Sequence, residues 1–65
     1  MFLEVTTCKN EKLSLNISNI VSVISEKKHT LIFDTAGVDY VVDEPYEVIM
    51  ERISSNFSPI FVKQI

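Results

Sequence analysis

Apolar and polar positions alternate through the first quarter of the chain. Leu3 and Val5 alternate with polar neighbours, and Leu13 and Leu15 do the same after the polar stretch 9–12. A period of two is typical of a strand that buries one face. Residues 9–12 have the composition of a turn. The pattern therefore predicts a hairpin of two strands at the start of the chain.

A third strand-like run, residues 20–24, follows a short corner at Ser18 and Asn19. Strict alternation along this run places Val21 and Val23 together on one side and isoleucines on the other. Because both sides are largely apolar, we expect both to be covered.

A second hairpin is predicted for residues 30–34 and 38–42. The runs are separated by Thr35, Ala36 and Gly37, and Gly37 is the only glycine of the chain. Glycine adopts positive φ without steric cost, which suits a tight turn.

One amphipathic helix is predicted from Pro45 to Ser55. Proline at the first helical position loses no hydrogen bond, and an acid just before it can accept free amide hydrogens. Apolar residues recur at spacings of three and four, which makes one apolar stripe: Tyr46, Ile49, Met50, Ile53 and Phe57. We expect this helix to lie across one sheet face.

The last residues of the chain, 60–65, are unusually apolar. They are expected to form a sixth strand or a docking segment. The fold class that follows is α+β, a small antiparallel β-meander of five or six strands with one helix near residues 45–55, in a single domain spanning residues 1–65.

The size of the chain limits its core. A chain of 65 residues buries only about 60% of the surface that it exposes when unfolded. Disulfides, a metal or a partner subunit usually supplement so small a core. The single cysteine, Cys8, excludes an internal disulfide, and Cys8 with His29 is too small a ligand set for tetrahedral zinc. Self-association is the remaining route.

The net charge and the lengths of the apolar runs limit the partners and the cellular location that we expect for this protein. The formal net charge is −3, and residues 34–65 hold six acids against Arg52 and Lys63. Direct binding of nucleic acid depends on clustered Lys and Arg, so we do not expect it. The N-terminus has no signal-peptide pattern and no apolar run approaches the roughly 18 residues of a membrane span, which indicates a cytoplasmic protein.

The residues that could carry chemistry have simpler explanations. The acids of the second half lack the spacing of a calcium loop and are expected at solvated strand ends and at the helix start, as an acidic patch: Asp34, Asp39, Asp43, Glu44, Glu47 and Glu51. His29 has no nucleophile or orienting acid nearby in sequence and is expected in an exposed turn. Cys8 is expected to pack in the interior, as are Phe33, Tyr40 and Tyr46. The sequence indicates no catalytic, cofactor-binding or metal-binding residues, and no enzyme.

Several segments together resemble the small FlbD-type flagellar proteins. The likeness runs from residue 5 to residue 53 almost without gaps and includes Asn16-Ile17-Ser18-Asn19-Ile20, Tyr40-Val41-Val42-Asp43-Glu44 and Val48-Ile49-Met50-Glu51-Arg52-Ile53. Matching positions are Asn16, Ile20, Thr30, Val42, Glu44, Val48, Ile49 and Ile53. The resemblance implies a role linked to flagellar motility. The second half is also similar to the opening strands of LytTR DNA-binding domains, which are longer and basic.

We expect a non-enzymatic accessory module that binds a protein partner or itself, as a homodimer. More apolar surface is predicted than one helix can cover, and such patches mark interaction sites. The expected contact residues are Val21, Val23, Ile60, Phe61, Val62 and Ile65. The alternative is a phage or mobile-element regulator that binds a host nucleic-acid enzyme through the acidic patch.

Overall fold

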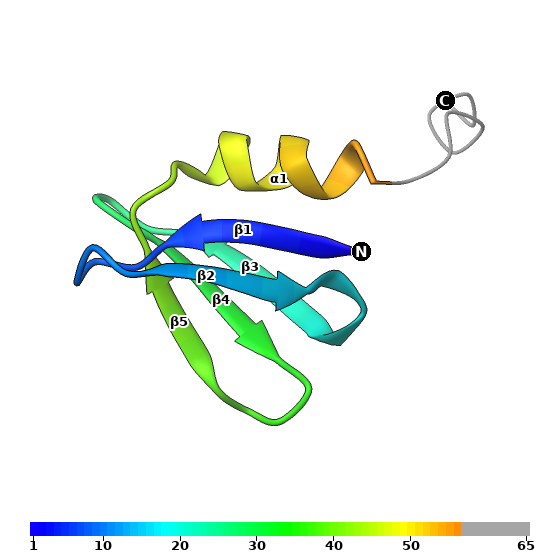
Figure 1. Ribbon diagram of the computed structural model, residues 1–65. Helices are drawn as coiled ribbons and strands as arrows, with labels where there is room; N and C mark the ends of the chain where they lie inside the picture. The colour runs from blue at the N-terminus through cyan, green and yellow to red at the C-terminus, as the bar shows by residue number, and fades with distance from the viewer. Residues whose placement is uncertain (57–65) are drawn as a thin grey trace.

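The computed structural model describes residues 1–56, which form two antiparallel sheets and one helix (Figure 1). The elements are β1 (Phe2–Thr6), β2 (Lys12–Asn16), the 3-10 turn η1 (Ile17–Asn19), β3 (Ile20–Ser25), β4 (Thr30–Asp34), β5 (Asp39–Val42) and α1 (Tyr46–Ser54). The predicted α+β class is confirmed with five strands. The predicted sixth strand or docking segment, 60–65, lies outside the described residues.

Strands β1 and β2 form the first predicted hairpin. Leu3 pairs with Leu15 and Val5 with Leu13, so the apolar residues of both strands share one face. Thr7 closes the turn, because its side-chain oxygen accepts hydrogen bonds from two turn amides. Asn10 adopts a φ of 67° there, which asparagine tolerates better than most residues.

The second sheet has the order β3-β4-β5. Its β4–β5 turn contains Gly37 at a φ of 82°, as the sequence predicts. The Asp34 carboxylate accepts hydrogen bonds from the Ala36 and Val38 amides across this turn, at 2.9 and 3.0 Å. The turn is thus held by a side chain as well as by its backbone.

A β-bulge near the start of β3 changes the side on which its residues lie. Ile20 pairs with Asp34 but the next pair is Ser22 with Phe33, so Val21 is an extra residue. The bulge shifts the alternation by one position. Ile20 and Val23 consequently pack against the core together, whereas Val21 is 65% exposed. The expectation that Val21 and Val23 share a side is wrong, and no element within residues 1–56 covers the side that carries Val21.

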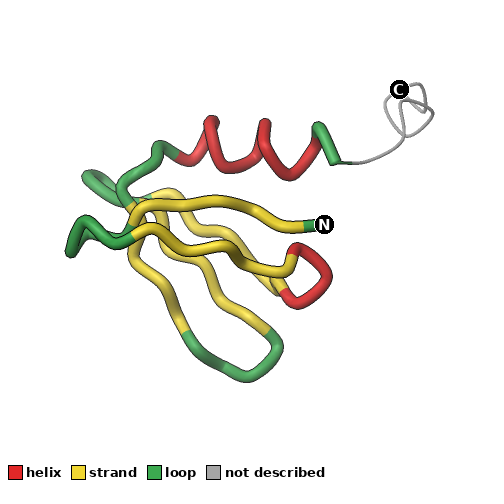
Figure 2. The backbone as a smooth tube through the Cα atoms, in the orientation of Figure 1, coloured by secondary structure: helices red, strands yellow, loops and turns green. Residues whose placement is uncertain are grey.

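The two sheets enclose a small core. They meet at one corner, where Thr7 bridges to Val42 and the Cys8 amide donates to the Val41 carbonyl. Figure 2 shows the strands of the two layers converging at this corner. The buried apolar residues come from both layers, from η1 and from the helix: Leu3, Val5, Ile17, Ile32, Val42 and Ile49.

Helix α1 packs against β1 and β3, one strand from each sheet. It runs along the open side of the two-layer structure (Figure 1). Ile49 is buried in the core, and Ile53 packs against it. The expectation that it lies across one sheet face is therefore corrected. Pro45 is the N-cap, and no side chain caps the helix start. The expected acid cap is absent because Glu44 has another partner, described below.

Candidate functional site

The β3-β4-β5 sheet has an apolar face turned away from the core. Residues paired across the three strands form rows. The rows Val23–Ile32–Tyr40 and Ser25–Thr30–Val42 face the core, and the alternate rows face away from it. We call the side that faces away from the core the outer face. Its apolar residues, which include the bulge residue Val21, are Val21, Ile24, Leu31, Phe33 and Val41.

The outer face is only partly shielded from water. Val21 is 65% exposed and Ile24 is 42% exposed, and Leu31, Phe33 and Val41 are half-buried. The β1–β2 hairpin lies against the inner face, and α1 lies along the side that β1 and β3 border. Among residues 1–56, therefore, no element forms a layer over the outer face.

The structure separates the interaction residues that the sequence indicates. Val21 belongs to the outer face, and Val23 packs against the core. Ile60, Phe61, Val62 and Ile65 lie outside the described residues. Sequence reasoning missed Ile24, Leu31, Phe33 and Val41. Alternation puts Leu31 and Phe33 on one side of β4, but it does not show which side meets the core. Phe33, expected in the core, belongs to this face, while Tyr40 does pack against the core.

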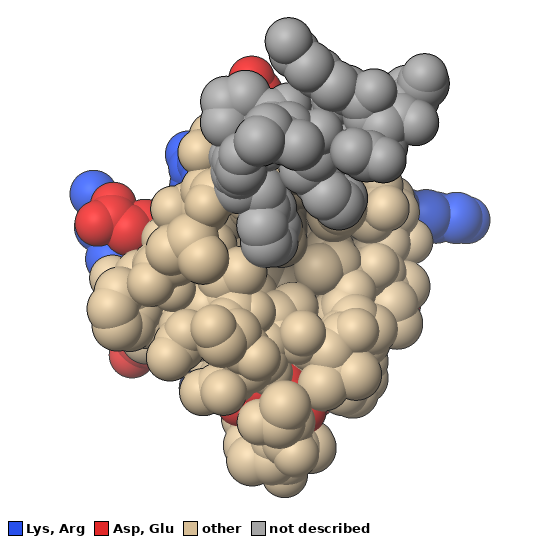
Figure 3. Space-filling model, turned by 90° about the vertical axis from the view of Figure 1, so that its right-hand side faces the viewer, with Lys and Arg blue, Asp and Glu red and all other residues tan. Residues whose placement is uncertain are grey.

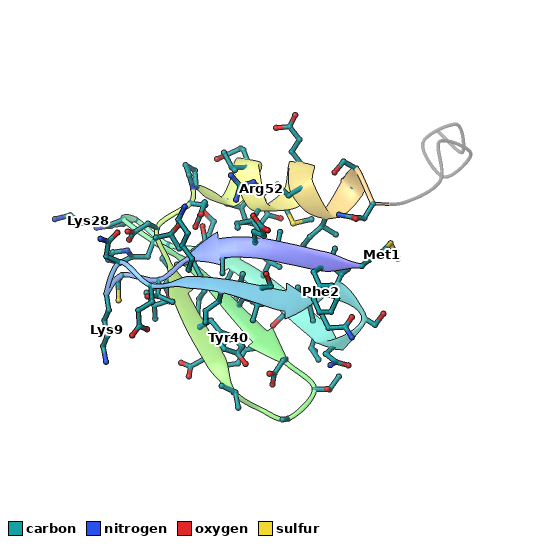
Figure 4. The ribbon with its side chains drawn as sticks, viewed as in Figure 1. Met1, Phe2, Lys9, Lys28, Tyr40 and Arg52 are labelled. Carbon is teal, nitrogen blue, oxygen red and sulfur yellow. The ribbon has the colours of Figure 1, made fainter. Side chains whose placement is uncertain are left out.

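Charged residues lie at opposite ends of the outer face. The β3–β4 loop carries Glu26, Lys27 and Lys28, all exposed, and Lys28 points away from the body of the molecule (Figure 4). Asp43 is exposed at the same end, beside His29 of this loop. Asp39, at the start of β5, pairs with Phe33 and is exposed near the other end of the sheet. The face thus has charges of both signs at one end and a carboxylate at the other.

Asp34 is committed to the β4–β5 turn. Besides the two turn amides, it accepts a hydrogen bond of 2.9 Å from the Tyr40 hydroxyl. Loss of hydration raises the pKa of this carboxyl, but the hydrogen bonds from Val38, Tyr40 and Ala36 lower the pKa by more. The same bond to Asp34 is the main cause that raises the pKa of Tyr40. Both side chains therefore stabilise the β4–β5 turn.

Glu44 links the second sheet to the first. Its Oε1 accepts a hydrogen bond of 2.8 Å from the Thr6 amide, and Arg52 Nη1 lies 3.4 Å from its Oε2. Arg52 also donates to the Glu4 carbonyl at 2.7 Å, and Figure 4 shows it between α1 and β1. Burial raises the pKa of Glu44, but the Thr6 amide and then Arg52 lower it below its usual value.

The six acids of the predicted patch are therefore distributed over the molecule. Asp34 and Asp39 lie at the β4–β5 end, and Asp43 lies beside His29, with 3.7 Å between the His29 Nδ1 and the Asp43 carboxylate. Glu47 and Glu51 are exposed on α1. Among residues 1–56 there is no group of three or more His, Cys, Asp and Glu side chains placed to hold a metal ion.

His29 lies in the loop between β3 and β4, as expected, whereas Cys8 differs from its expected surroundings. The side chain of His29 is 42% exposed, but its Nδ1 is buried and makes no hydrogen bond within the described part of the chain. Cys8 is exposed, so the expectation that it packs inside is wrong. It lies after the paired residues of β1, in the turn that leads to β2. The strand pattern that points alternate side chains towards the core does not extend to this turn.

A second, smaller apolar area lies at the N-terminal end of β1. Met1 and Phe2 are exposed there, at the end of the molecule opposite Lys28 (Figure 4). Seen from this end, the surface above the β4–β5 turn carries few charged side chains (Figure 3). Phe2 lies on β1, outside the outer face of the other sheet.

Comparison with known proteins gives one match. The model of the family FlbD, flagellar and swarming motility proteins, matches residues 2–61. No curated protein and no solved structure matches the chain. None of the helices within residues 1–56 has the length and hydropathy to cross a membrane. Because the family model matches nearly all of the 65 residues of the chain, the chain belongs to the FlbD family of flagellar and swarming motility proteins.

Proposed function

We propose that this protein is a non-enzymatic module that acts in flagellar motility by binding a protein through its outer face. The observation that carries the proposal is the apolar face of β3-β4-β5, which no described element covers. The family match supports the link to motility.

The chemistry of this face favours a protein partner. Its five apolar side chains are contiguous across three neighbouring strands. Contiguous apolar patches with a charged border are typical of protein–protein contacts, whose centres are depleted of charge. Binding would recover the burial that the second sheet lacks on this side.

The charged and nucleophilic side chains support a role without catalysis. Asp34 and Glu44 are held by backbone amides of the fold. His29 is paired only with Asp43, at 3.7 Å, and no hydrogen bond connects it to a nucleophile in the described part of the chain. General acid–base chemistry needs a proton donor or acceptor placed at a reacting group.

The test is genetic complementation in the organism that encodes the chain. A strain lacking the gene receives the wild type, Val21→Asp, Phe33→Asp or Phe2→Asp. We expect the first two substitutions to lose the rescue of motility, because each places a charge in the apolar face. Phe2→Asp is the matched control, since Phe2 is 62% exposed on β1, and it is expected to rescue as the wild type does.

Protein level and thermal unfolding of each variant are measured in parallel. Val21 is an extra, exposed residue of the bulge, so Val21→Asp keeps the test valid if Phe33→Asp does not fold. Full rescue by a folded Val21→Asp variant would overturn the proposal.

A further inference from the structure

We propose that two copies of this chain pair edge to edge through β2, and that the first sheets of both copies thereby form one antiparallel sheet with the strand order β1-β2-β2-β1. A two-fold axis beside Ser14 relates the copies. The contact uses a different surface from the outer face and goes beyond the proposed function.

The free edge of β2 presents backbone groups that β1 does not use. Hydrogen bonds at the two ends of the β1–β2 ladder join odd-numbered residues, from the Ile17 amide to the Met1 carbonyl and from the Thr7 amide to the Glu11 carbonyl. Hydrogen-bonded pairs alternate with non-hydrogen-bonded pairs in an antiparallel ladder, so the even-numbered residues of β2 direct their N–H and C=O groups away from β1. These residues are Lys12, Ser14 and Asn16.

The other strand edges within residues 1–56 are occupied or interrupted. On β1, the Thr6 carbonyl accepts from the Asp43 amide, and the Glu4 carbonyl accepts from Arg52. β3 has its bulge at Val21, and bulges protect an edge from pairing. The end of β5 already bonds to the segment that follows β1. β2 keeps a regular register over its five residues, and no backbone group of another described element bonds to its free edge at Ser14.

The apolar side of the first sheet is open along β2. Leu3 and Val5 of β1 are 1% and 2% exposed, whereas Leu13 and Leu15 of β2, on the same side, are only half-buried. β1 lies between β2 and α1 (Figure 1), so the helix covers the β1 side. A sheet of two strands is marginally stable by itself, and a strand added beside β2 would bury both leucines further.

The sequence of β2 identifies the added strand as a second β2. Its five residues, Lys-Leu-Ser-Leu-Asn, have the same order of polar and apolar positions in both directions. Antiparallel pairing about Ser14 places Leu13 beside the partner's Leu15 on the core side. Ser14 lies opposite its own copy, and the free N–H and C=O groups of the two edges bond to each other. A two-fold contact needs one such self-complementary surface.

No like charges meet along the paired strands. Lys12 is the charged residue of β2, and it lies opposite the partner's Asn16. The turn residues Lys9 and Glu11 continue beside the partner's η1, whose three residues, Ile17–Asn19, carry no charge.

The acids around β2 are compatible with this pairing. Glu4 lies on β1, so the Glu4 residues of the two copies are three strand spacings apart, about 14 Å, which exceeds the Debye length of about 8 Å at 0.15 M salt. Asp34 lies near Asn16, at the end of β2 that pairs with the partner's Lys12, an opposite charge. Asp39 is in a row that faces away from β2. The charged β3–β4 loop lies beside the start of α1, which β1 separates from β2.

The first experiment measures self-association of the full chain by sedimentation equilibrium from micromolar to millimolar concentration. The wild type is expected to move from monomer to dimer, because five residues per copy make a small, transient contact. Ser14→Pro is expected to stay monomeric, since it removes an edge N–H that β1 does not use and proline is tolerated in an edge strand. Ser14→Thr keeps the N–H and is the matched control.

A wild type that is monomeric at every concentration would overturn the proposal. So would a Ser14→Pro variant that dimerises as the wild type does. Val21→Asp is expected to dimerise normally, and loss of its association would place the contact on the outer face instead of β2.

The second experiment tests the two-fold axis by charge at Ser14, which is exposed. Ser14→Asp and Ser14→Lys are each expected to weaken self-association at least tenfold, because like charges then lie directly opposite each other. An equimolar mixture is expected to recover association, since the mixed dimer joins opposite charges. These variants keep the test valid if Ser14→Pro does not fold. A mixture that associates no better than either variant alone shows that the pairing about Ser14 is wrong.

Amide hydrogen exchange separates a second copy from the chain's own residues 57–65. Protection of the Ser14 amide is expected to rise with protein concentration. Protection that is the same at every concentration would assign the edge to a segment of the same molecule and contradict the dimer.

Discussion

At the scale of single residues, Glu44 shows how position in the fold overrides a local pattern. An acid directly before Pro45 is a good candidate for capping a helix. Its carboxylate instead accepts the Thr6 amide from the other sheet, at 2.8 Å, and contacts Arg52 on α1. One side chain thereby connects β1, the end of β5 and the helix. The Thr6 amide lies at the corner between the layers and is partly buried, and the Glu44 carboxylate is the side-chain acceptor that it has there.

Replacing Glu44 should therefore destabilise the fold. Glu44→Ala leaves the Thr6 amide without its partner, and the expected loss is about 1–3 kcal/mol. Glu44→Gln keeps an acceptor oxygen and should lose less. Urea unfolding at pH 7 measures both variants, and an unchanged Glu44→Ala would show that the contact contributes nothing.

The pH dependence of this contact has a defined sign. The pKa of Glu44 is lowered in the folded protein, so its stabilising effect is present above the ordinary glutamate pKa and is lost as the pH falls through the lowered value. The difference in unfolding free energy between wild type and Glu44→Gln should shrink on acidification from neutral pH. A difference that stays constant down to acid pH would contradict the role of the charge.

At the scale of elements, the bulge in β3 decides which residues are available for contact. Without it, strict alternation would place Ile20, Ser22 and Ile24 on one side. With it, Ile20 and Val23 reach the core, and Val21 and Ile24 face outward. The adjoining strands β4 and β5 keep regular pairing, so their outward apolar residues line up beside those of β3. The outer face therefore depends on one extra residue.

The bulge predicts opposite outcomes for two neighbouring valines. Val23→Asp brings a charge against the core and should cost about 2 kcal/mol or more. Val21→Asp changes an exposed residue and should alter the free energy of unfolding by less than about 0.5 kcal/mol in dilute protein. Denaturant unfolding of both variants at low protein concentration provides the measurement. Equal losses would show that β3 alternates regularly.

At the scale of the whole molecule, apolar surface and charge are arranged in different places. The outer face carries the apolar surface, and the acids are distributed over both ends of the second sheet and the helix. Two of them, Asp34 and Glu44, are held by hydrogen bonds within the fold. Attraction between a single acidic surface and a basic partner is therefore a weaker basis for binding than burial of the apolar face.

Much of the fold was predictable because it depends on local rules. The period of two in Leu3, Val5, Leu13 and Leu15 predicts the first hairpin, and Gly37 predicts the turn of the second. The candidate site was predictable only in part. Val21 was identified, but Leu31, Phe33 and Val41 were not, because a short apolar strand does not itself show which of its sides meets the core.

The sequence by itself determined the five strands, the helix and their order, since periodicity and turn residues act over a few neighbouring positions. Only the tertiary structure decided the bulge at Val21, the exposure of Cys8 and the use of Glu44 as a link between layers. The bulge depends on how β3 pairs with β4, and the Glu44 link joins segments far apart in the chain, Thr6 and Glu44. Such contacts form only after the two sheets have packed, because the most stable arrangement is the one in which buried polar groups are hydrogen-bonded and the apolar side chains of the sheets and the helix are buried together.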